Sequence, residues 1–315
     1  MTRVAALDCG TNSLRLLVAD LDGAGGKRDV HREMRVVRLG QGVDRTGRLA
    51  AEALERTRTA LVDYAQTCRD LGVEATRLVA TSATRDADNR EEFTGLVQDT
   101  LGVAPEVVTG AQEAALSFDG ATRDLDAADG PFLVLDIGGG STEFVLGTGG
   151  RSGAVRAALS VDIGCVRLTE RHLPGDPPSG PAVAAARADI RAALDRVRAA
   201  VPVEQARTAV GLAGSVTTLA ALALELPAYD AARIHLTRLS AATVAALTTQ
   251  LLGMTREQRA VLPVMHPGRV DVIAAGALIL STALQELGLD EILVSEADIL
   301  DGIAWSVLST DEGAG

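Results

Sequence analysis

Residues 133–146 read LVLDIGGGSTEFVL: an apolar run, an aspartate, three glycines, two hydroxyl residues, a glutamate and a second apolar run. Apolar runs of this length that flank a glycine turn are typical of buried strands, so the stretch predicts a hairpin. The three glycines carry no side chain, and their backbone N–H groups can therefore approach an anion closely. The serine and threonine add hydroxyl donors. The stretch predicts a turn that binds phosphate.

Two carboxylates stand at the mouth of this turn, Asp136 at the end of the first strand and Glu143 at the start of the second. Such a pair can hold a divalent cation over a bound anion. A plain glycine-rich hairpin is the alternative interpretation. It would need no acids at its mouth, because Asn-Gly or Asp-Gly is enough for a tight turn. The turn chemistry therefore favours a phosphate-and-metal loop.

The same pattern occurs a second time, 128 positions earlier. Residues 5–18 read AALDCGTNSLRLLV, so that Asp8 falls on Asp136, while Arg15 takes the place of Glu143. A repeat at this spacing indicates a duplicated domain rather than an array of short units. Two such hairpins that face each other would clamp one phosphate group from both sides.

Two halves that each open with such a hairpin resemble the superfamily of sugar kinases, actin and heat-shock chaperone ATPases. Within it, the two hairpins resemble the exopolyphosphatase / guanosine pentaphosphate phosphatase family. Four further segments match that family in its order: TSATRDADN at 81–89, TGAQEA at 109–114, GLAGSVTT at 211–218 and RVDVIAAG at 269–276. The resemblance spans residues 5 to about 305. It implies a duplicated actin-like α/β fold, two ribonuclease H-like domains flanking a cleft, and hydrolysis of a phosphoanhydride.

The composition is that of a globular protein of about two domains. The chain has 315 residues, of which 47% are hydrophobic and only 2% aromatic, so its core must be aliphatic. The net charge of −12 argues against bulk attraction of nucleic acid, although a local basic groove stays compatible with it. Lys27 is the only lysine beside 29 arginines, a bias that a GC-rich genome also explains.

Three cysteines (Cys9, Cys68 and Cys165) are too few and too scattered for a disulfide framework or a zinc site. We therefore expect a reducing, cytoplasmic location. Asp8 and Arg15 interrupt the N-terminal apolar run, so we expect no signal peptide. The most apolar stretch, residues 209–224, contains glycines and hydroxyl residues and is better read as a buried strand, turn and helix. No membrane association is expected.

We expect domain I at residues 1–121 plus 298–315 and domain II at 122–297, with the acidic stretch 122–130 crossing between them. Expected strands cover 4–9, 14–20, 31–39, 77–81, 105–108, 155–160, 206–212 and 292–295. Expected helices cover 49–71, 87–101, one opened by Gly110, one that ends near 200, and 299–308. We expect 41–47 and 174–181 to be loops. Longer family members carry a C-terminal hydrolase-like domain, and we expect no counterpart here.

The family resemblance assigns catalytic roles to four residues. Glu113, in the first turn of a helix, would orient or deprotonate the attacking water; without the resemblance it would be read as a capping carboxylate. Arg85 would hold the next phosphate, with a surface salt bridge as the alternative. Asp136 and Glu143 are the expected Mg²⁺ ligands, and Asp8 would face them. Ala111 and Gln112 stand where relatives often have acids, which leaves the details of water and metal coordination open.

The expected phosphate ligands are the turns of both hairpins and a third turn, with one more arginine: Gly10, Thr11, Asn12, Ser13, Gly138, Gly139, Gly140, Ser141, Thr142, Gly214, Ser215 and Arg269. The first hypothesis for function is a Mg²⁺-dependent exopolyphosphatase acting on short chains. A guanosine pentaphosphate phosphohydrolase is the alternative within the family. A small-molecule kinase and a non-enzymatic polyphosphate or nucleotide sensor are alternatives of other classes. Whether the protein forms a homodimer is left open.

Overall fold

A computed structural model describes residues 1–22 and 26–311, without the side chains of 308–311. The chain divides into two compact units. Unit 1 comprises Met1–Gly120 and Ile299–Gly315, and unit 2 comprises Ala121–Asp298. Each boundary lies one residue from the expected one. Unit 1 is thus built from both ends of the chain, and unit 2 from one continuous stretch.

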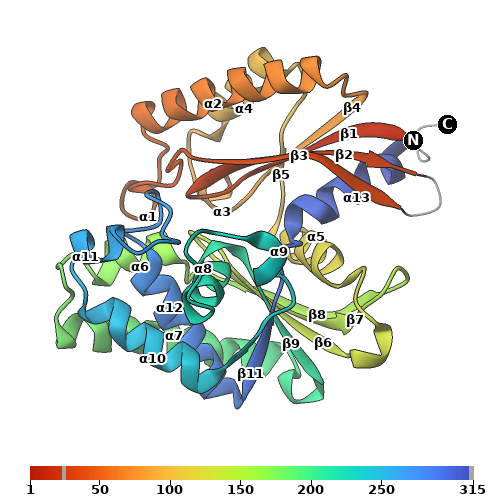
Figure 1. Ribbon diagram of the computed structural model, residues 1–315. Coiled ribbons are helices and arrows are strands. Elements are labelled where there is room, and N and C mark those ends of the chain that lie inside the picture. Colours follow the sequence, from red (N-terminus) through yellow and green to blue (C-terminus); the bar gives the residue numbers. More distant parts are fainter. Residues whose placement is uncertain (23–25, 312–315) are drawn as a thin grey trace. The chain divides into compact units, whose positions relative to one another are not determined.

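Unit 1 is built on a five-stranded sheet of order β3-β2-β1-β4-β5 (Figure 1). Its strands are β1 (Thr2–Cys9), β2 (Ser13–Leu21), β3 (Lys27–Val36), β4 (Ala75–Ala80) and β5 (Glu106–Val107). Its helices are α1 (Val43–Thr46), α2 (Ala51–Asp70), α3 (Ser82–Arg85), α4 (Arg90–Leu101), α5 (Gly110–Thr122), which runs into unit 2, and α13 (Ile299–Asp311).

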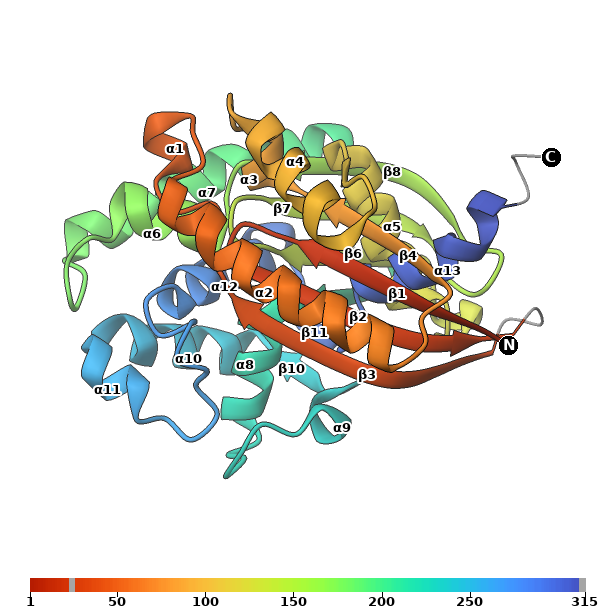
Figure 2. The same ribbon diagram turned by 90° about the horizontal axis from the view of Figure 1, so that it is seen from above.

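Both faces of this sheet are covered, which explains the nearly continuous apolar runs of β1 and β2. Alternate residues of β1 point to opposite faces: Ala5 and Leu7 pack in the core under α2 and α4, and Val4 and Ala6 pack in the core with α13. Figure 2 shows α2 and α4 side by side over one face of the sheet. The hairpin at the start of the chain is therefore held between two helical layers.

Unit 2 is built on a six-stranded sheet of order β10-β11-β9-β6-β7-β8. Its strands are β6 (Phe132–Ile137), β7 (Thr142–Thr148), β8 (Ala154–Val161), β9 (Thr208–Leu212), β10 (Arg238–Ser240) and β11 (Glu291–Val294). Its helices are α6 (Cys165–His172), α7 (Gly180–Ala200), α8 (Ala213–Ala223), α9 (Ala231–Ile234), α10 (Ala241–Gly253), α11 (Arg256–Ala260) and α12 (Ile273–Leu287), with 3₁₀ turns η1 (Ala127–Asp129) and η2 (Val203–Gln205). Helix α12 is apolar and buried almost all round, so it forms the centre of the core of this unit.

The two sheets repeat one topology. The order β3-β2-β1-β4 in unit 1 corresponds to β8-β7-β6-β9 in unit 2, with antiparallel and parallel pairs in the same places. The repeat extends to a defect: a β-bulge lies between Val18 and Ala19, and another lies 128 positions later between Leu146 and Gly147. The expected duplicated actin-like α/β fold is therefore confirmed.

Three short elements differ from the sequence prediction. The expected loop 41–47 contains one helical turn, α1, between glycines with positive φ at 42 and 47. The expected turn after β4 is the short helix α3, and the sequence gave no sign of the three-residue strand β10. Elements of three or four residues are too short for a hydrophobic period to show. The longer elements that were predicted lie at the expected places with shifted ends, whereas α10 and α12 had no predicted bounds.

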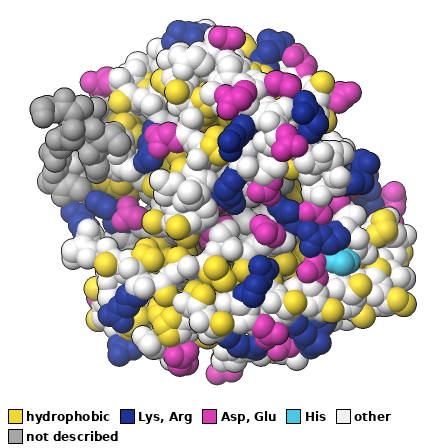
Figure 3. Space-filling model, turned by 180° about the vertical axis from the view of Figure 1, so that it is seen from behind, with side chains coloured by type: hydrophobic (Ala, Val, Ile, Leu, Met, Phe, Trp, Pro, Cys, Tyr) yellow, Lys and Arg dark blue, Asp and Glu magenta, His cyan; other side chains and the backbone are white. Residues whose placement is uncertain are grey.

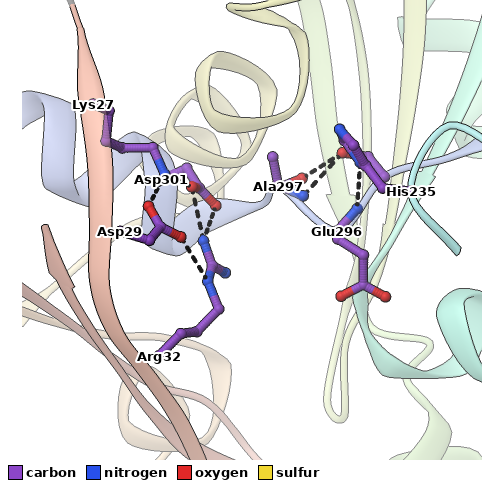
Figure 4. Close-up of polar contacts among 8 residues, drawn as sticks. Lys27, Asp29, Arg32, His235, Glu296, Ala297 and Asp301 are labelled. Carbon is purple, nitrogen blue, oxygen red and sulfur yellow. Dashed lines mark hydrogen bonds and ion pairs between the residues drawn. The ribbon is translucent and has the colours of Figure 1, made fainter. Parts of the chain in front are cut away.

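The C-terminal helix α13 is attached to β3 by ion pairs (Figure 4). Asp301, almost fully buried, accepts hydrogen bonds from Lys27 Nζ at 2.6 Å and from Arg32 Nη2 at 2.8 Å. Burial opposes ionisation of Asp301, but the two cations outweigh it and keep the pKa of its carboxyl below the ordinary value. Both ends of the chain are thereby joined in one unit. Among the described residues, no helix is long and apolar enough to cross a membrane.

Candidate active site

The two predicted phosphate loops are closed in the same way. Gly10 N donates to Ser13 O at 3.0 Å, and Gly138 N donates to Ser141 O at 3.0 Å. Each loop joins two antiparallel strands in register, so each begins and ends at a cross-strand pair. The repeat read from the sequence is thus a repeat of backbone geometry.

The second loop is held from behind through its carbonyl groups. Val166 N and Arg167 N donate to Gly139 O at 2.9 and 3.1 Å, and Arg167 Nε donates to Gly140 O at 2.7 Å. These donors come from the first turn of α6, whose N–H groups have no partner inside the helix. The N–H groups of Gly139 and Gly140 donate no hydrogen bond to the residues that the structure describes. They are therefore available to an anion.

Gly164, just before α6, is required for this support. A Cβ atom at residue 164 would lie 2.3 Å from Gly139 O and 2.5 Å from Gly140 N. Because both obstacles are backbone atoms, no side chain fits there without moving the loop.

The first loop is supported by the segment that follows β3. Gly40 N donates to Thr11 O at 2.8 Å, and Arg38 N donates to Asn12 O at 2.8 Å. The Thr11 hydroxyl shares a hydrogen bond of 2.8 Å with Ser82 Oγ in α3. The predicted ligand Thr11 thus has its hydroxyl engaged within the fold. The same holds for Thr142, whose hydroxyl donates to Ile163 O at 2.5 Å.

The cross-strand pairs beside the two loops differ in charge. Asp136 lies opposite Glu143, both are buried, and Glu143 Oε1 accepts a hydrogen bond of 2.7 Å from Ser160 Oγ. Asp8 lies opposite Arg15, which donates to Asp8 Oδ2 from Nε at 2.9 Å and from Nη2 at 2.7 Å.

Opposite residues of an antiparallel pair share one face of the sheet, so the two acids of unit 2 lie side by side. Mg²⁺ is commonly held by one or two carboxylates together with water and substrate phosphates, and this pair fits that donor set. The described residues contain no cluster of three or more acidic, histidine or cysteine side chains arranged for a metal. Asp8 belongs to the other unit, and its role as a metal ligand stays a prediction.

The third predicted turn is the first turn of α8, which follows β9 directly, and Arg269 packs against it. A Cβ atom on Gly214 would lie 2.3 Å from Cζ of the Arg269 guanidinium, which also donates to Thr218 Oγ1 at 3.2 Å. The residue with positive φ in this turn is Ala213, at 65°, a conformation that costs free energy for a residue with a Cβ atom. Gly214 therefore serves close packing, and the structure brings Gly214, Ser215 and Arg269 into one neighbourhood.

Cys165 lies beside this turn and is inert. Burial raises the pKa of its thiol to about 11, against a smaller opposing effect from a hydrogen bond with Ser215. Burial, with a further contribution from the charge of Asp8, also raises the pKa of Cys9 well above its ordinary value. This environment is that of a small, buried strand residue rather than of a nucleophile.

Glu113 and Arg85 meet in unit 1. Glu113 lies in the first turn of α5 with 7% of its surface exposed, and its Oε2 accepts a hydrogen bond of 3.0 Å from Arg85 Nη1. The same nitrogen donates to Val108 O at 3.0 Å. Two anchors on one nitrogen fix the guanidinium, and the guanidinium orients the carboxylate. These two predicted catalytic residues are therefore adjacent.

Four residues that flank or support the two loops were not predicted as site residues: Arg15, Ser82, Gly164 and Arg167. Arg15 was visible in the repeat as the residue that replaces Glu143. Ser82 lies in the segment 81–89 that matches the family, and its hydroxyl contacts Thr11. Gly164 and Arg167 contact the backbone of the second loop, and no local pattern marks them.

Two units of one topology, each with a glycine loop at the end of its first strand, define the class of duplicated actin-like α/β proteins that bind phosphate. A model of the Ppx/GppA phosphatase family matches residues 17–311. The chain belongs to the Ppx/GppA phosphatase family, and it is therefore an enzyme of the phosphatase class, as the resemblance implied.

Individual relatives agree with this assignment. Exopolyphosphatase 2 of Mycobacterium tuberculosis is 55% identical over 320 residues, which cover 98% of this chain and 99% of that protein. Guanosine-5'-triphosphate,3'-diphosphate pyrophosphatase of Aeromonas salmonicida is 29% identical over 98% of this chain and 60% of its own length. The crystal structure of an exopolyphosphatase-like protein matches with a TM-score of 0.92 and 42% identity, over 96% of this chain and 98% of that one.

Proposed function

We propose that the protein is a Mg²⁺-dependent exopolyphosphatase that releases orthophosphate from the end of inorganic polyphosphate, and that short chains suffice as substrates. The observation that carries the proposal is the 55% identity, over nearly the full length of both chains, to a protein named Exopolyphosphatase 2. The paired loops support it, since bare backbone N–H groups suit the oxygens of a phosphate chain.

In this proposal Glu113 orients and deprotonates the attacking water. Hydrolysis of a terminal phosphate needs an aligned water and neutralisation of charge rather than a covalent intermediate. Arg85 supports both needs: its contact with Oε2 sets the direction of the carboxylate, and its charge can be shared with an incoming phosphate. Gly139 and Gly140 supply N–H donors to the phosphate oxygens.

Asp136 and Glu143 would hold Mg²⁺ in this proposal. The cation would neutralise part of the charge of the phosphate chain. The chemistry of the two carboxylates, oxygen ligands side by side at the mouth of the loop, supports this assignment. Asp8, already paired with Arg15, would contribute to the surroundings of the phosphate.

The first experiment measures orthophosphate release from short polyphosphate, long polyphosphate, guanosine pentaphosphate and ATP, with Mg²⁺ or with a chelator. We expect release from polyphosphate that depends on Mg²⁺ and falls roughly 10²–10⁴-fold in Glu113→Gln. Glu204→Gln, at an exposed glutamate in η2, is the matched control and should keep wild-type rates. Folded wild-type protein that bound polyphosphate but released nothing would refute the hydrolase and favour a sensor.

A second candidate is hydrolysis of guanosine pentaphosphate to the tetraphosphate. The match over 98% of this chain to the Aeromonas salmonicida pyrophosphatase favours it, and both substrates end in a phosphoanhydride. Faster release from guanosine pentaphosphate than from any polyphosphate in the same assay would establish this function instead.

The metal assignment has a test that does not depend on activity. A ligand that binds only the folded state raises the stability by RT ln(1 + [L]/Kd). We expect Mg²⁺ to raise the Tm of the wild-type protein, and the increase to be lost or much reduced in Glu143→Gln. An equal Mg²⁺ effect in both proteins would exclude Glu143 as a ligand.

A further inference from the structure

Unit 1 contains a cavity of about 580 Å³ that none of the predicted site residues lines. It lies between α1 and the first turns of α2, which adjoin each other in Figures 1 and 2. Its polar lining comes mainly from Gln41, Arg45, Arg48, Glu52 and Arg56. Three of these five side chains are arginines and one is an acid, so the cavity carries a net positive charge on a protein of net charge −12.

Two of the three arginines are not neutralised by a carboxylate. The Arg45 side chain forms no hydrogen bond or ion pair with any residue that the structure describes. Arg56 donates only to neutral oxygens, those of Val37, Arg38 and Gln41. Arg48 has only an exposed contact of 3.4 Å with Glu92. By contrast, basic and acidic side chains alternate over the molecular face in Figure 3.

Two parts of the cavity wall are held by hydrogen bonds within the fold. Arg56 Nε donates to Val37 O at 2.8 Å, and Arg56 Nη2 donates to Gln41 Oε1 at 3.2 Å. On the other side, Asn89 bonds both backbone groups of Leu49, at 2.8 and 3.1 Å. Groups that are already ordered lose less conformational entropy on binding. Arg56 and the backbone of Leu49 are therefore in place before a ligand binds, whereas the exposed Arg45 side chain can turn toward it.

Arg56, which lines the cavity, also holds the segment that supports the first phosphate loop. Val37 and Arg38, whose carbonyl groups Arg56 holds, donate their N–H groups to Asn12 O at 3.1 and 2.8 Å. The cavity is thus continuous with the support of the predicted substrate loop, within one unit.

The chemistry of the lining selects a phosphate chain. Arginine binds phosphate oxygens through a planar pair of donors and keeps its charge at any physiological pH. No aromatic side chain lines the cavity, so it offers no platform on which a nucleobase could stack. The N-terminus of the 20-residue helix α2, which has no side-chain cap, adds partial positive charge.

We propose that this cavity is a second phosphate-binding site, which holds internal phosphates of a polyphosphate chain. That the bound chain is polyphosphate rests on the proposed function; the positive charge of the cavity and its lack of an aromatic side chain do not. A long chain gains a contact here that a short one lacks. Short chains would still be hydrolysed, but long chains would bind more tightly.

Equilibrium binding in the presence of a chelator, without turnover, tests the site. The probes are long polyphosphate, tripolyphosphate and a single-stranded RNA, and the variants are Arg45→Ala and Arg45→Glu. Arg196→Ala and Arg196→Glu are matched controls, because Arg196 is an exposed helical arginine of α7 with no partner among the described residues.

We expect Arg45→Ala to raise the Kd for long polyphosphate roughly threefold to tenfold, Arg45→Glu to raise it further, and tripolyphosphate to change less. The slope of log Kd against log salt should fall by about 0.7–1 for one lost phosphate contact. Equal effects of the Arg45 and Arg196 substitutions would overturn the site. RNA binding with the same dependence on Arg45 would also overturn it, in favour of a general polyanion surface.

The outcomes separate this site from the proposed function. If long polyphosphate bound in a way that depends on Arg45 but no phosphate were released in Mg²⁺, the second site would be supported and the hydrolase function refuted. If phosphate were released from polyphosphate but binding did not change in the Arg45 variants, the hydrolase function would be supported and the second site refuted. The Arg45 side chain has no partner among the described residues to lose, so the Arg45 variants should melt at the wild-type temperature. Arg48→Ala repeats the comparison at a second arginine of the cavity, and unchanged binding of long polyphosphate in that variant as well would overturn the site.

Discussion

One cross-strand pair distinguishes the two otherwise similar loops. Asp8 faces Arg15, and the two charges cancel within the fold, whereas Asp136 faces Glu143 and the pair can take up a cation. The repeat in the sequence showed the exchange of an acid for an arginine. It could not show that Arg15 points at Asp8, because an arginine side chain has several rotamers and the pattern does not select among them.

The glycines behind the two loops give a prediction at single residues. Gly164→Ala should destabilise the protein more than Gly40→Ala. A Cβ on residue 164 meets the backbone of Gly139, which cannot rotate away, whereas a Cβ on residue 40 meets Cγ2 of Thr11 at 2.3 Å. Overpacking against a side chain, as at residue 40, typically lowers stability by about 1–3 kcal/mol, measured as the free energy of unfolding in denaturant.

Thr11→Ser supplies the control for this pair. It removes the methyl group that Gly40→Ala would meet and keeps a hydroxyl for Ser82. The double variant Gly40→Ala/Thr11→Ser should recover most of the lost stability, whereas Thr11→Ser should do nothing for Gly164→Ala. If Thr11→Ser restored the stability of both glycine variants, or of neither, the proposed contact between residue 40 and the Thr11 methyl group would be contradicted.

Among the elements, length decided what could be predicted. The hairpins and the long helices α2, α4, α5, α7 and α13 follow from apolar period and turn residues alone. The short α1 and α3 and the edge strand β10 depend on contacts with distant segments. Leu239 of β10, for example, pairs with Ile292 of β11. The cavity beside α1 was beyond prediction for the same reason.

The attachment of α13 gives a prediction about one element. Asp301→Asn should lower the free energy of unfolding by about 3 kcal/mol at neutral pH, because it leaves the partly buried Lys27 and the exposed Arg32 without the buried carboxylate that they share. Asp29→Asn, at an exposed acid that contacts the same two cations, is the control and should cost less than about 1 kcal/mol.

The difference in stability between the wild type and Asp301→Asn should change with pH in a definite direction. The pKa of Asp301 is lower in the folded protein, so its stabilisation is present above the ordinary pKa of aspartate and is lost as pH falls through the lower, folded value. Denaturant unfolding at a series of pH values should show the wild type and Asp301→Asn converging in acid. A difference that stayed constant into that range would mean that the charge of the Asp301 carboxylate does not stabilise the attachment of the helix.

At the level of the whole molecule, the sequence repeat predicted the duplication, and the equivalent bulges at 18/19 and 146/147 confirm how closely the halves correspond. The repeat did not predict how the second half is enlarged. Helices α9 to α11 and strand β10 have no counterpart in unit 1, and α9, α11 and β10 are too short for a hydrophobic period to distinguish a helix from a strand. A tertiary core around α12 decides between these possibilities.

The discontinuity of unit 1 predicts the order in which the molecule unfolds. Unit 1 needs α13, which is joined to the rest of the unit through the whole of unit 2, so that loss of unit 2 adds a long-loop closure cost to unit 1. Unit 2 is one continuous stretch with its own core. We therefore expect unit 1 to open at a lower denaturant concentration than unit 2.

The cysteines report on both units. Burial raises the pKa of Cys68 in unit 1 and of Cys165 in unit 2 to about 11, so at pH 8 both should react with a thiol reagent on the order of a hundredfold more slowly than free cysteine. In a denaturant series read by peptide mass, Cys9 and Cys68 should become labelled first and Cys165 later. A Cys165→Ala variant should lose only the later step. Labelling of Cys165 before Cys68 would show that unit 2 depends on unit 1, and that the continuous half is the less stable one.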